Sequence, residues 1–122
     1  TLKAVREALP NYRICAVFQP HRYTRTRDLM SDFAKSFFDA DHLFVTDIYA
    51  ASEKPIEGID APRLVAEIRQ HGFKDVQHLE SWKELYPRLE EQGLDNVVII
   101  TMGAGSITTL SLEIAEWVKK HA

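Results

Sequence analysis

Short apolar runs alternate with amphipathic segments along the whole chain, and this alternation restricts the fold more than any other feature of the sequence. The apolar runs are too short for core helices, so they predict strands at 13–18, 42–47, 75–79 and 96–101. The segments between them carry apolar residues three or four positions apart, which predicts helices at 27–39, 61–71, 82–92 and 107–120. Such alternation predicts an α/β fold, doubly wound, with a mostly parallel sheet and helices on both faces.

The last apolar run, "NVVIIT", is apolar at consecutive positions rather than at alternate ones. A strand with this pattern is covered on both faces, which is the usual state of strands in a parallel sheet. We therefore predict that 96–101 is the central strand of the sheet.

Several helix ends are marked by residue types that cap helices. Asp60 precedes the helix predicted at 61–71, and Pro62 lies in its first turn. Ser81 and Glu84 have the spacing of a capping box, in which each side chain binds the backbone amide of the other residue. These signals support the two helices independently of the apolar spacing.

The chain has 122 residues, the length of one ordinary domain, and it opens on an amphipathic segment at 1–9 that predicts a further helix. A doubly wound unit usually opens on a strand, so we expect a strand and its following loop ahead of Thr1. The alternative is an α/β domain that simply begins with a helix.

The charge and composition argue against several classes of partner. The formal net charge is −3, which gives no reason to expect a nucleic acid or an anionic membrane as a partner. No apolar run approaches the roughly 20 residues that span a bilayer. The single cysteine, Cys15, lies in an apolar run, as a core thiol does in a reducing compartment. We therefore expect a cytoplasmic protein.

The connection after the first strand concentrates positive charge where ligands bind in parallel sheets, beyond the carboxyl ends of the strands. "QPHRYTRT" places His21, Arg22 and Arg25 beside the start of the next helix, where Thr24 or Thr26 can act as the cap. Helix amides and forked guanidinium groups both favour a carboxylate or a phosphate. Cations at a helix N-terminus are unfavourable without an anion to receive them, so the pattern predicts an anion site.

A second interpretation of the same residues remains open. Arg22 and Arg25 can be solvated loop arginines that pair with local acids such as Asp28 or Asp47. The pattern of residues does not separate the two interpretations, because both place the arginines in a polar connection.

Two other connections reach the same edge of the predicted sheet. "DIYAASEKPIEGID" brings Asp47 and Tyr49, and "TMGAGS" brings Gly103, Gly105 and Ser106. Two glycines between a strand and a helix permit a close backbone approach to a ligand, or simply a turn that needs small residues. The chain contains no P-loop motif, and no pair of histidines has the spacing of metal ligands, so we expect no metal site.

The three segments "FQPHRYTRTRDL", "DIYAASEKPIEGID" and "TMGAGSI" resemble, in order and spacing, the C-terminal domain of the Mur ligases of peptidoglycan synthesis. The similarity spans essentially the whole chain, and the first segment is most similar to the alanine-adding members. The resemblance implies one Rossmann-like domain over 1–122 that lacks its first strand. Ser106 departs from the family pattern, in which an acidic residue is common, and this leaves the role of its loop open.

The resemblance implies an ATP-dependent ligase that adds L-alanine to UDP-N-acetylmuramate. ATP phosphorylates the muramoyl carboxylate, and the alanine amine attacks the acyl phosphate. ATP and magnesium would be bound mainly by a central domain absent from this chain, so we expect the chain alone to be inactive and to carry no cofactor. The alanine carboxylate or an adjacent phosphate would bind His21, Arg22 and Arg25. Further loop contacts would come from Thr24, Asp47, Tyr49, Gly103, Gly105 and Ser106.

Two other functions compete with the ligase interpretation. The chain can be a free-standing anion-binding module without catalysis, which has the same arginine-rich connection. A Rossmann-like oxidoreductase domain is disfavoured, because no G-x-G-x-x-G follows the first strand.

Overall fold

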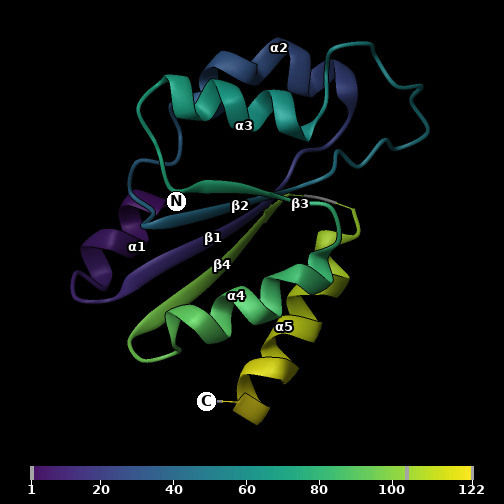
Figure 1. The fold of residues 1–122 in the computed structure, drawn as a ribbon. Coiled ribbons are helices and arrows are strands. Elements are labelled where there is room, and N and C mark those ends of the chain that lie inside the picture. The colour runs from purple at the N-terminus through teal and green to yellow at the C-terminus, as the bar shows by residue number, and fades with distance from the viewer. Residues whose placement is uncertain (1, 104, 122) are drawn as a thin grey trace.

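Four parallel strands lie in the order β3-β2-β1-β4 in the computed structural model, which describes residues 2–103 and 105–121 (Figure 1). The strands are β1 (Arg13–Gln19), β2 (His42–Thr46), β3 (Val76–Leu79) and β4 (Val97–Gly103). Cys15 in the middle of β1 is in register with His42 of β2 on one side and with Ile99 of β4 on the other. All of these pairings are parallel, as the alternation predicts.

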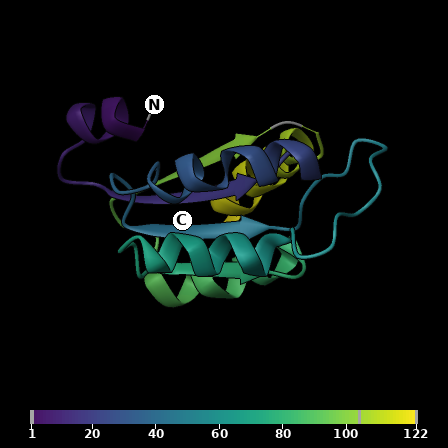
Figure 2. The same ribbon diagram turned by 90° about the horizontal axis from the view of Figure 1, so that it is seen from above.

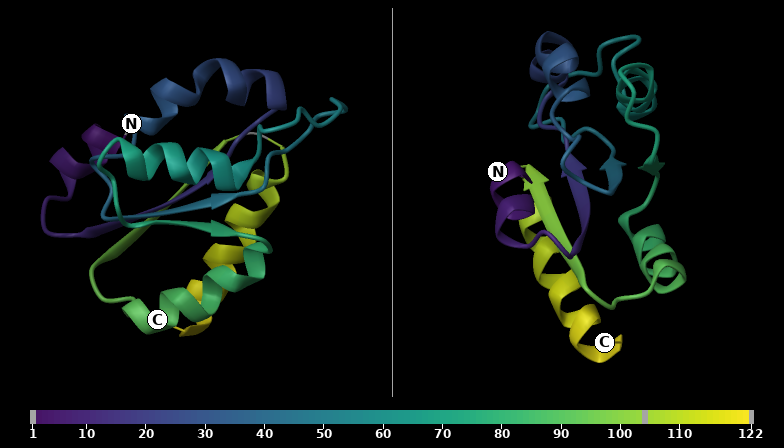
Figure 3. Two further views of the ribbon diagram at one scale, coloured as in Figure 1. Left: turned by 45° about the horizontal axis from the view of Figure 1, so that its top comes forward. Right: turned by 90° about the vertical axis from the view of Figure 1, so that its left-hand side faces the viewer.

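Helices cover both faces of this sheet, which confirms the predicted fold class (Figures 1 and 3). One face carries α2 and α3, and the opposite face carries α4 and α5. The helices are α1 (Leu2–Ala8), α2 (Tyr23–Ala34), α3 (Ala61–Gln70), α4 (Leu85–Gln92) and α5 (Ile107–His121), and a 3-10 turn, η1 (Trp82–Glu84), leads into α4. No helix in the described part of the chain is both long and apolar enough to cross a membrane.

β1 is a buried strand whose successive side chains enter two separate apolar layers. Ile14 and Ala16 pack on the side of α1, α2 and α3, whereas Cys15 and Val17 pack on the side of α4 and α5. Burial raises the pKa of the Cys15 thiol to about 12, so the thiol stays protonated. The prediction of Cys15 as a core residue is confirmed.

The prediction that 96–101 is the central strand is wrong, because β4 pairs only with β1 and lies at an edge of the described sheet. Val97 and Ile99 still pack toward α4 and α5, and Ile100 and Met102 pack toward the opposite layer. A continuous apolar run therefore reports that both faces of a strand pack against helices, although residues 97–102 of β4 stay only half-buried. It carries no information about which strands lie along its two hydrogen-bonding edges.

The predicted helix starts are confirmed where the capping residue lies next to the helix in the sequence. The Asp60 side chain accepts a hydrogen bond from the Arg63 amide at 2.8 Å, and both halves of the predicted capping box are present. α2, in contrast, begins four residues before the predicted 27–39 and ends earlier. Phe37, which extends the apolar spacing past the helix end, is a buried core residue in the turn that follows α2.

Candidate functional site

Three connections meet beyond the carboxyl ends of the strands, and Tyr49 contacts the other two. His21 and Tyr49 form an isolated parallel bridge, and their rings are stacked with centroids 5.7 Å apart. A Cβ placed on Gly105 would lie 2.7 Å from the Tyr49 ring, so only glycine allows this approach. The structure thus brings together three residues that the sequence predicted for the site. In Figure 2, the 47–60 loop projects past this end of the sheet.

The start of α5 is held by a side chain that the sequence analysis missed. Gln19, at the end of β1, donates from Nε2 to the Ser106 hydroxyl at 2.8 Å, and its Oε1 accepts from the Ile107 amide at 3.0 Å. Gly103 lies against the same residue, since a Cβ there would be 2.5 Å from the Gln19 carbonyl oxygen. The signal available in the sequence was Gln19 itself, a polar residue at the end of an otherwise apolar strand.

The two arginines of the predicted anion site are exposed, and the charge of Arg22 is one of the causes that lower the pKa of the nearby Glu53 carboxyl. Neither Arg22 nor Arg25 has a side-chain hydrogen bond or an ion pair within residues 2–103 and 105–121. Asp28, one of the acids that could have paired with them, contacts Arg27 at 3.0 Å. The two acids named in the alternative, Asp28 and Asp47, therefore do not pair with these arginines, but the exposure of both side chains and the proximity of Arg22 to Glu53 keep the alternative of solvated loop arginines open.

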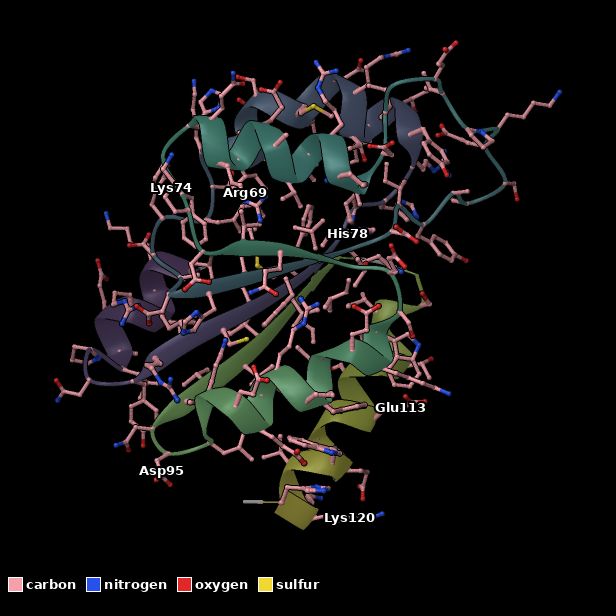
Figure 4. All side chains as sticks on the ribbon, in the orientation of Figure 1. Arg69, Lys74, His78, Asp95, Glu113 and Lys120 are labelled. Atoms are coloured by element: carbon pink, nitrogen blue, oxygen red, sulfur yellow. The ribbon has the colours of Figure 1, made fainter. Side chains whose placement is uncertain are left out.

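Asp47, the other candidate acid, pairs with a histidine from the neighbouring strand. Its Oδ1 lies 2.6 Å from Nε2 of His78, near the ends of β2 and β3. Figure 4 shows His78 between β3 and α3, on the face of the sheet that also buries Val76. The Asp47 carboxylate is thereby directed toward β3 rather than toward the arginines.

The first turn of α2 is capped by Glu53, which lies 30 positions along the chain, and the predicted cap at Thr24 or Thr26 is wrong. Glu53 Oε1 accepts from the amides of Tyr23 and Thr24 at 2.7 and 3.2 Å, and its Oε2 accepts from the Thr24 hydroxyl at 2.6 Å. Both threonines lie inside the helix, and the buried Thr26 hydroxyl donates to the Arg22 carbonyl. The Thr24 hydroxyl bond is the main reason that the pKa of Glu53 is lowered.

A cavity of about 360 Å³ lies at the same end of the sheet, but on the face of α4 and α5. Of the predicted site residues, Asp47 and Ser106 line it, whereas the arginine-rich connection does not. Glu113, labelled in Figure 4, closes the side formed by α5. Its walls are formed by Gln19, Thr46, Asp47, Leu79, Glu80, Ser81, Trp82, Ser106, Ile107, Thr109, Leu110 and Glu113.

The described residues contain no cluster of three or more histidine, cysteine, aspartate or glutamate side chains that could hold a metal ion. Beyond the strand ends, two exposed guanidinium groups and a stacked His21–Tyr49 pair lie on one side, and a cavity lined by both polar and apolar side chains lies on the other. Guanidinium groups suit carboxylates and phosphates, and nothing in this arrangement resembles an activated nucleophile.

Comparison with known proteins identifies the family. Residues 1–105 match the family model described as "Mur ligase, glutamate ligase domain". The chain belongs to the Mur ligase C-terminal domain family. A UDP-N-acetylmuramate–L-alanine ligase of Pelobacter propionicus is 51% identical over 108 residues, and one of Trichlorobacter lovleyi is 46% identical over 107. Each alignment covers 88% of this chain but only 23% and 24% of the relatives, so the chain spans about a quarter of their length.

Solved structures of Mur ligases share the fold of this domain. The UDP-N-acetylmuramate–alanine ligase of Thermotoga maritima superposes with a TM-score of 0.68 at 26% identity, over 99% of this chain and 24% of that one. A domain of a putative UDP-N-acetylmuramate:L-alanyl-gamma-D-glutamyl-medo-diaminopimelate ligase from Haemophilus ducreyi gives 0.58 at 23% identity, over 92% of this chain and 73% of that one. At that identity the second likeness concerns the fold alone.

Proposed function

We propose that this Mur ligase domain is the amino-acid-binding C-terminal part of an ATP-dependent ligase that adds L-alanine to UDP-N-acetylmuramate in peptidoglycan synthesis. The family description names glutamate, whereas the relatives above are named for L-alanine, and this supports alanine as the amino acid. The observation that carries the proposal is the pair of free guanidinium groups of Arg22 and Arg25 beyond the strand ends. Such groups suit the carboxylate of an amino acid or an adjacent phosphate.

The proposed role of the domain is to position a substrate rather than to activate it. Arg22 and Arg25 bind the alanine carboxylate, His21 donates a further hydrogen bond, and the amine is thereby directed at the acyl phosphate. Holding the amino acid converts a bimolecular attack into a positioned one, and the arginines offset negative charge gathered around the phosphate. The proposal includes further contacts to the substrate from the surrounding segments, through Thr24, Asp47, Tyr49, Gly103, Gly105 and Ser106.

ATP and magnesium are assigned to a central domain outside this chain. The described residues offer no metal-binding cluster, and the sequence has no P-loop, so the residues present do not fit either group by themselves. The proposal includes a cytoplasmic enzyme, because nucleotide-linked precursors and ATP are found there. The chain alone is expected to give no turnover with ATP, L-alanine and UDP-N-acetylmuramate, as measured by phosphate release against a blank.

The test is kinetic and uses the full-length ligase that carries this domain. Arg25→Ala is expected to raise the KM for L-alanine about ten- to a hundredfold, the worth of one charge-assisted hydrogen bond. Lysine at the same position restores only part of the affinity, because a point charge does not replace a two-point fork.

Arg27→Ala is the matched control, since Arg27 lies on the same helix but is paired with Asp28. It is expected to leave the KM for L-alanine unchanged. Folded Arg22→Ala and Arg25→Ala enzymes with wild-type constants for alanine and ATP would contradict the binding role of the two arginines. A full-length protein without any turnover of L-alanine would instead favour the free-standing anion-binding module.

A further inference from the structure

The 20–25 connection and the 47–60 loop are joined by backbone hydrogen bonds as well as by the stacked rings. The Tyr49 amide donates to the Pro20 carbonyl at 2.9 Å, and the Arg22 amide donates to the Tyr49 carbonyl at 2.8 Å. These two bonds extend the pairing of β1 and β2 past the strand ends. Beyond them, the loop has no further backbone bond to α2 among the described residues, and the next attachment is a side chain.

That attachment is the Glu53 carboxylate, which uses both of its oxygens on the first turn of α2. It accepts the Tyr23 and Thr24 amides and the Thr24 hydroxyl, at 2.6 to 3.2 Å. Arg22, in the cap position of α2, contributes no side-chain cap of its own. Glu53 is thus the anion that sits at this helix N-terminus, and an external anion meets guanidinium groups rather than free amides.

Unfavourable backbone conformations gather at this contact. Arg22, Ala51 and Ser52 have φ values of 69°, 51° and 73°, in the left-handed region that favours glycine. Such conformations persist only where surrounding contacts hold them. Ala51 and Ser52 immediately precede Glu53, and Arg22 immediately precedes the amides that Glu53 binds. The Glu53 carboxylate therefore links the two segments next to their unfavourable backbone conformations.

We infer that Glu53 is a positioning residue: its carboxylate fastens the 47–60 loop to the first turn of α2 and so keeps Arg22, Arg25 and Tyr49 in one fixed arrangement. The inference rests on the proposed function, in which the arginines bind the amino acid. Glu53 itself does not touch the substrate, since both of its oxygens are engaged. Without it, the loop detaches beyond Tyr49, and the conformation of Arg22 relaxes.

The experiment compares Glu53→Ala and Glu53→Gln in the full-length ligase with two readouts. Hydrogen exchange without substrates measures the amides of Tyr23 and Thr24, and steady-state kinetics measures KM and kcat for L-alanine. Glu53→Ala is expected to speed exchange of both amides by about tenfold or more and to raise KM roughly tenfold, with a smaller change in kcat. Glu53→Gln keeps an oxygen that can accept from the amides. It is therefore expected to have an exchange rate and a KM close to those of the wild type.

Two variants of the same loop serve as controls. Glu57→Ala removes an exposed carboxylate that makes no hydrogen bond or ion pair within the described residues, and it is expected to change neither readout. Asp60→Ala removes the cap of α3 and lowers stability, yet it is expected to leave KM for L-alanine unchanged. A rise in KM for Asp60→Ala equal to that for Glu53→Ala would show an effect of stability alone and would overturn the inference.

Two other results would overturn the positioning role without touching the proposed function. One is unchanged exchange of the two amides in Glu53→Ala, and the other is faster exchange with a wild-type KM for L-alanine. If the wild-type ligase does not use L-alanine at all, the proposed function fails, and the positioning role fails with it.

Discussion

Helices α2 and α5 both begin at the edge of the sheet where the strands end, and each is capped by a side chain from elsewhere in the chain. For α2 the cap is Glu53, a charged carboxylate on a projecting loop. For α5 the cap is Gln19, a neutral amide that is only 9% exposed and sits at the end of a core strand. The two caps perform the same hydrogen-bonding task with groups of different charge and burial.

The difference lies in where each capping group comes from. The α5 start is built into the framework, since Gln19 belongs to β1, and Gly103 is pressed against its backbone. The α2 start depends on a loop that approaches from outside the sheet and brings its own charge. The α2 start carries the arginines of the proposed substrate site, and the α5 start forms a wall of the cavity.

The largest effect is expected from a change that disrupts the α5 start. Gly103→Ala places a Cβ 2.5 Å from the Gln19 carbonyl oxygen at a φ of 135°, so the backbone of β1 or of the α5 turn must shift. We expect a loss of about 3 kcal/mol or more in the free energy of unfolding. Urea denaturation followed by tryptophan fluorescence measures it.

Gly58→Ala is the control for the Gly103 change, because its φ is also positive while nothing lies within 4 Å of the added Cβ. It is expected to lower the free energy of unfolding by about 1–2 kcal/mol, because only the left-handed conformation is unfavourable for alanine there. Equal losses in the two variants would mean that the close approach to Gln19 does not constrain the α5 start.

A smaller loss is expected when the neutral cap is removed. Gln19→Leu keeps the approximate size of the side chain but leaves the Ile107 amide and the Ser106 hydroxyl without their partner. An unsatisfied buried amide costs about 1–3 kcal/mol, and urea denaturation is expected to show a loss in that range. Gln70→Ala, at the exposed end of α3, is the control and is expected to change the free energy of unfolding by no more than about 0.5 kcal/mol. If the Gln19→Leu protein is as stable as the Gln70→Ala protein, the Gln19 cap does not stabilise the start of α5, and the comparison of the two caps fails.

The smallest effect is a titration that only the charged cap shows. Hydrogen bonds lower the pKa of Glu53 below its ordinary value of 4.5, with the Thr24 hydroxyl as the largest cause. The contact is therefore fully present above the ordinary value and is lost as the pH falls through the lowered one. NMR shifts of the Tyr23 and Thr24 amides are expected to titrate below pH 4.5, whereas the Ile107 amide, bonded to a glutamine, does not follow this titration.

Glu53→Gln provides the control for that titration. In this variant the two amide signals lose the acidic transition, because the neutral acceptor has no proton to gain. A transition that survives the substitution belongs to another group, and the assignment of Glu53 as the charged cap of α2 would then be wrong.

The sequence alone was sufficient for the fold class and for the residues that lie near the strand ends. Apolar spacing reports which faces of an element are covered, and local caps such as Asp60 and the Ser81–Glu84 box depend only on residues three positions apart. The expected strand ahead of residue 1 and the binding roles of Arg22 and Arg25 stay predictions.

Tertiary structure alone decided the edge position of β4 and the partners of the two distant caps. Strand order depends on hydrogen bonds along strand edges, which leave no trace in the apolar pattern of the strand itself. Glu53 and Gln19 lie 30 and 88 positions from the groups they cap, so only the folded chain brings each of them to its helix. A polar residue in a loop or at a strand end signals that it needs a partner, and the packing of elements distant in sequence determines which partner it meets.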